Sequence, residues 1–304
     1  MLVVAALGGN ALLRRGEPAD VDTQRRNVAV AADALAELAG AHSVIVTHGN
    51  GPQVGLLALQ AESYLQVSPY PLDVLGAESE GMIGYLLEQQ LSGRLRGRQA
   101  ATLLTQVIVD GEDPAFLHPS KPIGPLYDRP DAERVAAERG WSVAADGERW
   151  RRVVPSPRPQ RIVELQTIRT LVHAGVLVVC VGGGGIPVTA DEHGALRGVE
   201  AVIDKDLAAE LLAREMGADA LLLLTDVPYV ERDHGSARAQ PIVEVVAGEL
   251  DPGRFAAGSM RPKLEAAQAF VLATGGIAAI GALEDAAAIL AGQAGTQIVR
   301  ARQQ

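Results

Sequence analysis

The sequence alternates short apolar runs with longer amphipathic runs, and this alternation limits the fold more than any other feature. The apolar runs that predict buried strands lie at 2–7, 43–47, 176–181, 220–225, 277–280 and 297–299. Runs with helical spacing are expected at 23–39, beyond Pro52, at 162–172, from 207 onward, at 262–273 and at 285–290. Strand–helix alternation of this kind predicts an α/β protein whose mostly parallel sheet is covered by helices on both faces.

The stretch 114–160 interrupts this pattern. It contains eight of the 17 prolines and both tryptophans. A proline-rich insertion of this length inside an α/β domain is more often a functional lid than a linker. We therefore expect a small protruding subdomain that carries Lys121.

The charge balance argues against a nucleic-acid partner. The chain has a formal net charge of −10, whereas a nucleic-acid-binding face is basic. One local basic cluster, formed by Arg149, Arg151 and Arg152, surrounds Trp150. Because the total charge is acidic, we interpret this cluster as a solvated hairpin edge rather than a nucleic-acid patch.

Cysteine usage and apolar patterning indicate a cytoplasmic protein. Cys180 is the single cysteine, so no intramolecular disulfide or Cys-based zinc cluster is possible, and a reducing compartment fits best. Its apolar surroundings predict a buried, inert thiol. The N-terminal stretch has no basic region, so no export signal is predicted. The stretch 170–190 lacks charged Asp, Glu, Lys and Arg, but glycines and Pro187 break it, so no membrane span is expected.

Glycine-rich turns follow three of the predicted strands. They are Gly8-Gly9-Asn10, His48-Gly49-Asn50-Gly51 and Gly182-Gly183-Gly184-Gly185. In parallel α/β sheets, ligands bind beyond the carboxyl ends of the strands. Glycine lets backbone N–H groups approach an anion closely, although tight turns between strand and helix need glycine in any case. Together, the three turns predict an anion-binding crevice.

Several familiar phosphate and metal motifs are absent. No lysine follows a glycine, so there is no P-loop, and the spacing beyond Gly49 and Gly51 misses the dinucleotide pattern. There is no nucleophile elbow and no zinc helix, and the six histidines show no metal-ligand spacing. We predict no protein-built metal site. His48 adjoins a glycine turn, where it either positions a ligand or makes structural hydrogen bonds.

Lysine is rare in this chain. Of 27 basic residues, only Lys121, Lys205 and Lys263 are lysine, and all three lie in segments rich in Gly, Pro or Asp. A mobile ammonium group can follow the charge of a phosphoryl group in transfer, whereas the planar arginine fork favours fixed bidentate contacts. Asp204 and Asp206 flank Lys205, where they could orient its ammonium group and also hold Mg²⁺. We predict that the three lysines bind phosphate, helped by the N-termini of the helices near 205 and 263.

The motifs together resemble those of carbamate kinases, in the family order and over essentially the whole chain. They are ALGGNALL at 6–13, THGNGPQVG at 47–55, PSKPIGP at 119–125, RRVVPSPRP at 151–159, CVGGGGIPV at 180–188, GVEAVIDKDLAAELLA at 198–213 and GSMRPKLEAA at 258–267. The sequence departs from the family at Pro228, where carbamate kinases commonly carry an acidic residue.

The resemblance implies a fold and an activity. The fold would be the amino acid kinase fold, an open three-layer αβα sandwich in one domain spanning 1–304. A carbamate-binding lobe would cover about 1–195, including the lid subdomain at about 114–160, and a nucleotide-binding lobe would cover about 196–304. The implied reaction is reversible phosphoryl transfer between ATP and carbamate, giving ADP and carbamoyl phosphate, in a cytoplasmic homodimer. It would form ATP during breakdown of arginine, agmatine or purines.

The resemblance also implies roles for individual residues. Carbamate and the transferring phosphoryl group would be held by Gly8, Gly9, Asn10, Gly49, Asn50, Gly51, Gly183 and Gly184. The catalytic residues would be Lys121, Lys205, Lys263 and Asp206, with Asp206 organising the lysines. ATP or ADP would contact Thr225, Asp226, Tyr229, Ser259 and Met260 together with Lys205 and Lys263, and Mg²⁺ would be held mainly by the nucleotide phosphates.

Two other functions compete with this one. Another carboxylate kinase of the same fold would commonly have a lysine in the first motif, where this chain has Ala6. A non-catalytic nucleotide-binding module would have lost a lysine or Asp206, and none is lost.

Overall fold

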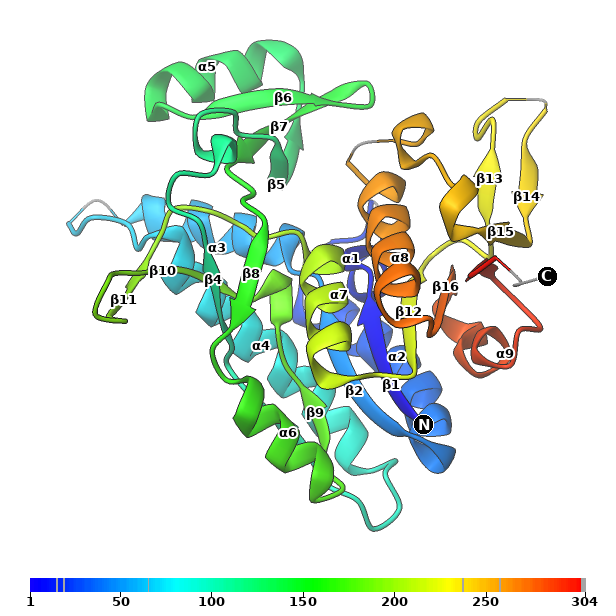
Figure 1. Cartoon of the computed structure of the whole chain (residues 1–304). Coiled ribbons are helices and arrows are strands. Elements are labelled where there is room, and N and C mark those ends of the chain that lie inside the picture. The colour runs from blue at the N-terminus through cyan, green and yellow to red at the C-terminus, as the bar shows by residue number, and fades with distance from the viewer. Residues whose placement is uncertain (15, 19, 65, 237, 257, 302–304) are drawn as a thin grey trace.

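The computed structural model describes residues 1–14, 16–18, 20–64, 66–236, 238–256 and 258–301, and of Asn10 and Ala11 only the backbone. Its centre is an eight-stranded sheet (Figure 1). In spatial order the strands are β15 (Glu244–Val246), β17 (Thr296–Val299), β16 (Ile277–Ala282), β12 (Ala220–Thr225), β1 (Leu2–Leu7), β2 (Ser43–His48), β9 (Leu177–Val179) and β3 (Ala100–Thr102). Every neighbouring pair is parallel except β16 and β17, which confirms the predicted, mostly parallel sheet.

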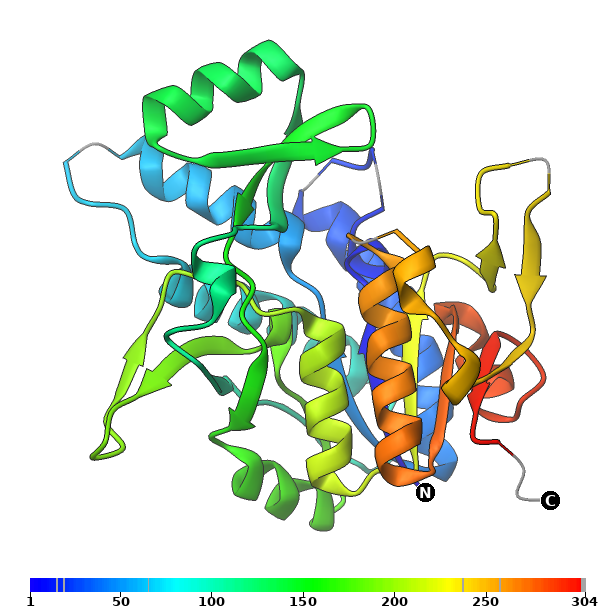
Figure 2. The same cartoon turned by 45° about the horizontal axis from the view of Figure 1, so that its top comes forward.

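Helices cover both faces of this sheet (Figure 2). Along β1, Val3 and Ala5 point into one core and Val4 and Ala6 into the other, as the two-residue period of a strand requires. The first core is closed by α2 (Val21–Ala41), α4 (Leu72–Ser92) and α9 (Ala286–Leu290). The second is closed by α6 (Leu165–His173), α7 (Lys205–Met216) and α8 (Met260–Thr274). The fold is thus the expected αβα sandwich.

Smaller elements extend this frame. A four-stranded sheet has the order β11 (Leu196–Gly198), β10 (Ile186–Ala190), β4 (Gln106–Val109) and β8 (Pro159–Ile162). Further elements are α1 (Gly9–Leu12), α3 (Gly51–Ser63) and the hairpin of β13 (Val230–Arg232) and β14 (Gln240–Ile242). Within the described ranges, no helix is long and apolar enough to cross a membrane.

Several predicted boundaries differ from the structure by one or two residues, and two differ for a physical reason. The helix expected at 162–172 begins at Leu165, because Ile162 ends strand β8, where it pairs with Val107 and is buried in the core. Its apolar side chain matched the helical spacing only by coincidence. The strand expected at 176–181 spans only Leu177–Val179, because Val181 adopts a left-handed φ of 53° and turns the chain.

The proline-rich insertion forms a projection above the sheet (Figure 1). It contains a three-stranded sheet of β5 (Lys121–Tyr127), β7 (Arg149–Val154) and β6 (Ser142–Asp146), with α5 (Arg129–Arg139) packed on it. Arg149, Arg151 and Arg152 were predicted to lie on a solvated hairpin edge. That prediction was wrong, because they belong to β7, the central strand of this sheet. The guanidinium groups of Arg152 and Arg139 lie 4.4 and 5.0 Å from the ring centre of Trp141, so cation–π contacts hold these arginines.

The projection is seated on helix α3. Glu62, near the end of α3, forms ion pairs with Arg139 and Arg152. Near the middle of the same helix, the backbone of Gly55 packs directly on Gly124 of β5, which has a left-handed φ of 73°. A Cβ atom at Gly55 would lie 2.0 Å from the Gly124 Cα atom, so the contact requires glycine.

We therefore expect Gly55→Ala to lower the free energy of unfolding by ~1–3 kcal/mol, because backbone would have to move to admit the methyl group. Gly40→Ala in α2 is the matched control, since no atom lies within 4 Å of the added Cβ there. This change should raise the free energy of unfolding by ~0.5–1 kcal/mol. Urea denaturation of both variants measures the difference, and equal stability of the two would contradict the packing argument.

Candidate functional site

The first two glycine turns meet at the carboxyl ends of the neighbouring strands β1 and β2. The Gly8 N–H donates to the Leu224 carbonyl of β12 at 2.7 Å, which fixes the first turn. A Cβ atom on Gly49 would lie 3.0 Å from the Gly9 nitrogen and 3.2 Å from Cδ of Lys205. The turns therefore touch each other and the aliphatic stem of Lys205. The side chain of Asn10, a predicted substrate contact, lies outside the described part of the chain.

The third turn completes the floor of the site. Gly183 and Gly184 have φ values of 66° and 97°, which side-chain-bearing residues rarely adopt. A Cβ atom on Gly183 would lie 2.1 Å from Nδ2 of Asn50, so the Asn50 amide group lies directly on the Gly183 backbone. Gly51, in the second turn, is closest to the Pro122 carbonyl of β5, at 3.9 Å from its would-be Cβ. The predicted glycines of all three turns thus surround one place.

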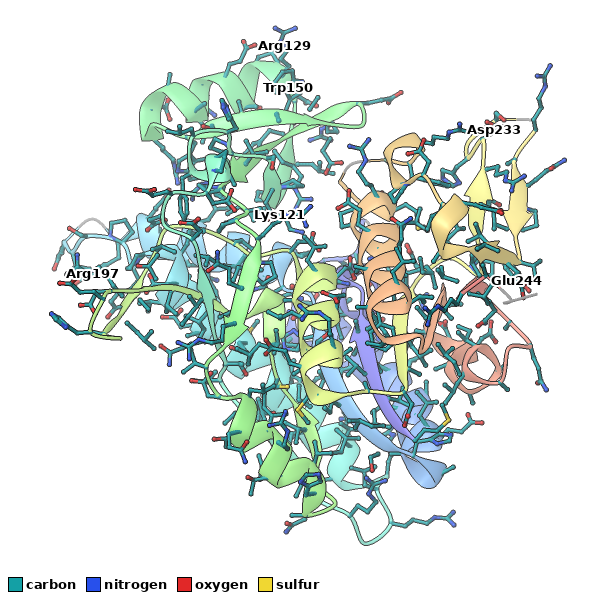
Figure 3. All side chains as sticks on the ribbon, viewed as in Figure 1. Lys121, Arg129, Trp150, Arg197, Asp233 and Glu244 are labelled. Atoms are coloured by element: carbon teal, nitrogen blue, oxygen red, sulfur yellow. The ribbon has the colours of Figure 1, made fainter. Side chains whose placement is uncertain are left out.

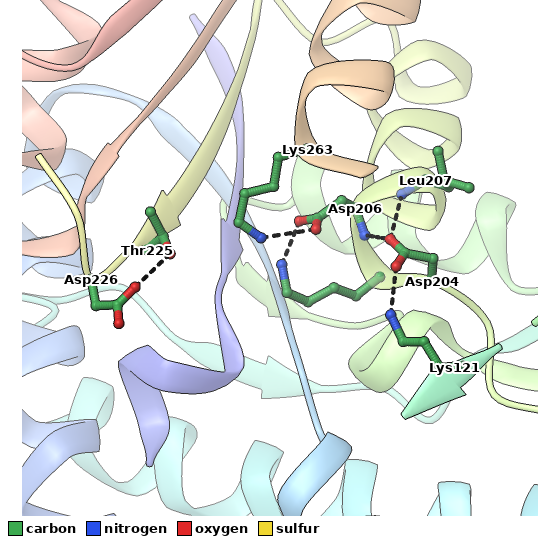
Figure 4. Close-up of polar contacts among 8 residues, drawn as sticks. Lys121, Asp204, Asp206, Leu207, Thr225, Asp226 and Lys263 are labelled. Carbon is green, nitrogen blue, oxygen red and sulfur yellow. Dashed lines mark hydrogen bonds and ion pairs between the residues drawn. The ribbon is translucent and has the colours of Figure 1, made fainter. Parts of the chain in front are cut away.

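The three lysines converge on two aspartates beside these turns (Figure 4). Figure 3 shows Lys121 at the base of the projecting subdomain. The Asp206 carboxylate accepts from Lys205 through Oδ1 and from Lys263 Nζ through Oδ2, the latter at 2.9 Å. Lys121, from the projecting subdomain, donates to Oδ2 of Asp204. The structure therefore brings together Lys121, Lys205, Lys263 and Asp206 from three elements distant in sequence.

Asp204 was predicted to orient Lys205, but in the structure its carboxylate has two other partners. Its Oδ1 accepts from the backbone N–H groups of Asp206 and Leu207, at 2.9 and 3.4 Å, so it caps the N-terminus of α7. Its Oδ2 binds Lys121. Its position just before the helix is a strong N-cap signal, from which the capping role could have been predicted.

Burial and pairing set the charges of the cluster. Burial alone would raise the pKa of Asp206, but the ammonium groups of Lys205 and Lys263 outweigh it and hold that pKa well below the usual range. Burial lowers the pKa of Lys205 to about 8, against the opposing effect of Asp206. Burial also disfavours the charged form of Lys263, yet the Asp206 carboxylate raises its pKa above normal. Of the two lysines bound to Asp206, Lys205 therefore loses its proton first.

Two of the predicted nucleotide contacts, Thr225 and Asp226, lie beside Lys263 in Figure 4. Thr225 ends strand β12, and its hydroxyl donates to Asp226 Oδ1 at 3.1 Å. Figure 4 shows this pair on the opposite side of Lys263 from Lys121. Tyr229 is half-buried in the loop after β12, while Ser259 precedes α8 and Met260 begins it. Ser259 and Met260 therefore lie at the N-terminus of α8, within one turn of Lys263.

The sequence analysis did not predict the buried polar residues Glu80 and Thr105 behind the turns, because they lie in segments without a motif. Glu80 of α4 accepts from the Gly182 N–H at 2.7 Å and from the Thr105 N–H at 3.2 Å, and burial raises its pKa to about 8. The Thr105 hydroxyl oxygen in turn accepts from the Val181 N–H at 3.1 Å. Two side chains therefore hold the strained start of the third turn from below.

His48 has a structural position. It is fully buried, and a Cβ atom on Gly182 would lie 2.4 Å from its Nε2 atom, so the ring packs under the third turn. Burial lowers the pKa of His48 to about 4, helped by the nearby Lys205 ammonium group. The ring is neutral near pH 7. Cys180 is buried as predicted, and burial raises its thiol pKa.

The site offers no ready cage for a metal ion. Among the described residues, no group of three His, Cys, Asp or Glu side chains could hold one. The carboxylates of Asp204 and Asp206 are both bonded to lysine ammonium groups. A divalent cation here would need most of its ligands from a bound molecule.

Comparison with known proteins gives consistent matches over the whole chain. Residues 1–280 match the model of the amino acid kinase family. Carbamate kinase from Haemophilus influenzae is 50% identical over 301 residues, which are 99% of this chain and 97% of that protein. A Giardia lamblia carbamate kinase structure bound to citric acid superposes with a TM-score of 0.93 at 41% identity, and another bound to AMP-PNP with 0.88 at 42% identity; each comparison covers 98% of both chains.

We expect Asp206→Asn to lower the free energy of unfolding by ~3–5 kcal/mol, because it leaves two buried ammonium groups without their shared carboxylate. The control is Asp33→Asn, which removes the exposed partner of Arg94 and should leave stability nearly unchanged. Urea unfolding at pH 7 compares the two. If Asp206→Asn is as stable as the control variant, the carboxylate does not neutralise the lysines.

Proposed function

Because the chain belongs to the carbamate kinases of the amino acid kinase family, we propose that its buried lysine cluster carries the transfer of a phosphoryl group between ATP and carbamate. The observation that supports this proposal is the arrangement of Lys121, Lys205 and Lys263 around two aspartates at the carboxyl ends of the strands. Three ammonium groups against two carboxylates leave one excess positive charge beside the glycine turns. Such a site attracts and stabilises a phosphoryl group.

The glycine turns bind carbamate and the phosphoryl group in this proposal. The residues concerned are Gly8, Gly9, Asn10, Gly49, Asn50, Gly51, Gly183 and Gly184. The N–H groups of Gly8, Gly49 and Gly184 already donate to carbonyl groups of the protein, so in this proposal the donors for anionic oxygens are the backbone N–H groups of the other turn residues. Lys205 and Lys263 act on the phosphoryl oxygens, and Asp206 keeps both ammonium groups in position.

The reaction needs no general base. Carbamate is already an anion with a nucleophilic oxygen, so the enzyme has to align it with the phosphoryl group and offset the repulsion between negative charges. Lys121 contributes from the projecting subdomain, close to the Gly51 turn. His48 is neutral and lies beneath the third turn, so it is not needed for proton transfer.

The nucleotide binds at the start of α8 in this proposal, along Thr225, Asp226, Tyr229, Ser259 and Met260, with Lys205 and Lys263 at its phosphates. The AMP-PNP complex of the Giardia relative supports nucleotide use. Mg²⁺ comes with the nucleotide and is held mainly by its phosphates, because Asp204 and Asp206 are already bonded to lysines. When bound, it neutralises phosphate charge.

The organisation of the chain follows from these assignments. Residues of about 1–195 form the carbamate lobe, including the lid subdomain at about 114–160, and residues of about 196–304 form the nucleotide lobe. We further propose a homodimer in the cytoplasm that runs in the ATP-forming direction during catabolism of arginine, agmatine or purines. The single, buried Cys180 is compatible with a reducing compartment.

The decisive experiment measures ATP formed from MgADP and carbamoyl phosphate by the purified protein, with acetyl phosphate as the comparison. We expect rapid ATP formation from carbamoyl phosphate. A folded, ADP-binding protein that forms no ATP from it would refute the proposed function.

Substitution of the lysines tests the roles assigned to them. Lys205→Ala and Lys263→Ala should each lower kcat at least ~100-fold, because each removes a charge that acts on the transferring group. Arg214→Ala, at the far end of α7, removes only a charge paired with Glu210 and should leave kcat unchanged. A lysine variant with nearly normal kcat would remove that lysine from the mechanism.

The pKa of Lys205 predicts the alkaline side of the pH profile. Its value of about 8 means that the ammonium form dominates at lower pH and is lost above it. The ratio kcat/KM for carbamoyl phosphate should therefore be constant below pH ~8 and fall tenfold per pH unit above it. In Lys205→Arg the rate is lower, but this decline should disappear, since arginine keeps its charge. A decline that stays at the same pH in Lys205→Arg belongs to another group.

A further inference from the structure

Two consecutive residues in the middle of α4 support the second and third glycine turns from behind. Ser79 is fully buried and bonds to the Asn50 side chain, while Glu80 accepts from the Gly182 N–H. Neither residue belongs to a recognised motif or contacts the lysine cluster. Helix α4 therefore controls the orientation of groups in the second and third turns.

The hydrogen bonds of Ser79 have a definite direction. Its hydroxyl has one hydrogen, and Oγ lies 2.8 Å from the Gly76 carbonyl oxygen, which can only accept. The hydrogen is therefore used there, and the Ser79 oxygen acts as an acceptor toward its other neighbour. That neighbour is Nδ2 of Asn50, also at 2.8 Å. These two hydrogen bonds turn the NH₂ end of the Asn50 amide toward the helix.

The other end of the amide is an acceptor without a donor. Asn50 is only 5% exposed, and its Oδ1 accepts no hydrogen bond from any residue in the described part of the chain. Oδ1 is not fully enclosed either, so part of its surface is accessible to a ligand. A buried carbonyl oxygen that faces a binding site favours a ligand with an N–H or O–H group.

Carbamate, the proposed substrate, has a hydrogen-bond donor on one side only. The oxygens of carbamate are negatively charged acceptors, which an amide oxygen repels, whereas its NH₂ group is a donor. Acetyl phosphate has a methyl group in the corresponding position. The Asn50 oxygen can therefore distinguish the two acyl groups, provided that the amide cannot turn over.

We propose that Ser79 is a positioning residue that fixes the Asn50 amide so that Oδ1 accepts from the amino group of the acyl substrate, and that this contact gives the enzyme its preference for carbamoyl over acetyl phosphate. The inference rests on the proposed function, which puts Asn50 among the residues that bind carbamate. A site built to bond a substrate N–H rejects an analogue without it, because the buried acceptor is then left unpaired.

Ser79→Ala tests this inference. The variant removes the acceptor for the Asn50 NH₂ group, so the amide can rotate and present NH₂ instead of oxygen. Steady-state ATP formation from MgADP is measured with carbamoyl phosphate and with acetyl phosphate. We expect the ratio of the two kcat/KM values to fall about tenfold, because one neutral hydrogen bond is lost only with carbamoyl phosphate. The KM for MgADP should change less than ~twofold.

Ser92→Ala is the matched control. It lies on the same helix and its hydroxyl bonds the Glu88 carbonyl at 2.7 Å, but it is exposed and far along the helix from Asn50. It should leave the ratio unchanged. Calorimetric titration of Ser79→Ala with MgADP checks that the fold and the nucleotide site are intact.

The outcomes separate this inference from the proposed function. If the unmodified enzyme forms no ATP from carbamoyl phosphate, the function itself is refuted. If the unmodified enzyme is active but Ser79→Ala keeps the same ratio, the positioning role is refuted. An equal loss with both acyl phosphates would also overturn the inference, because it would show that Ser79 only supports the turn.

Discussion

The contact on which the site depends is the Asp206 carboxylate between the ammonium groups of Lys205 and Lys263. Neither lysine could stay charged in this buried position without it, because an uncompensated buried ammonium group loses its proton or destabilises the fold. The contact also joins α7 to α8, which belong to separate strand–helix units of the sheet. Asp204 adds Lys121 from the projecting subdomain and begins α7 at the same time. One short acidic segment thus links three parts of the chain and, in the proposed function, keeps the positive charge where a phosphoryl group passes.

The glycine turns and the lysines make different demands on the structure. In the proposed function the lysines need freedom to move with the transferring group, and their stems are long enough to allow it. The turns need the opposite, since backbone N–H groups act on an anion only when they are held in place. Val181, a β-branched residue with a left-handed φ, shows the cost of that conformation. Glu80 and Thr105 offset it by bonding the N–H groups of Gly182 and Val181.

Much of this arrangement could be predicted from the sequence, for reasons that particular residues make clear. Strands β1 and β12 match their predicted limits, because buried parallel strands are continuous apolar runs between glycine or polar turns. The lysines were found because the chain otherwise uses arginine. Ser79 and Glu80 could not be found, because they reach the site only through tertiary packing, across 29 positions to Asn50 and 102 to Gly182. Ile162 was assigned to a helix because a buried apolar residue satisfies either period.

The division between backbone and side chains also explains where substrate specificity has to reside. Backbone N–H groups and lysine ammonium groups are donors, so they bind any anionic oxygen, whether it belongs to carbamate, to acetate or to a phosphate. Donors alone cannot recognise an amino group. Recognition requires an acceptor oxygen that is buried, oriented and not bonded to its own protein. In the described part of the glycine turns, the side-chain oxygen that meets these conditions is Oδ1 of Asn50. In the proposed arrangement, the hydroxyl of Ser79 fixes its orientation. In the proposed mechanism, catalytic power and substrate choice are therefore carried by different chemical groups of one site.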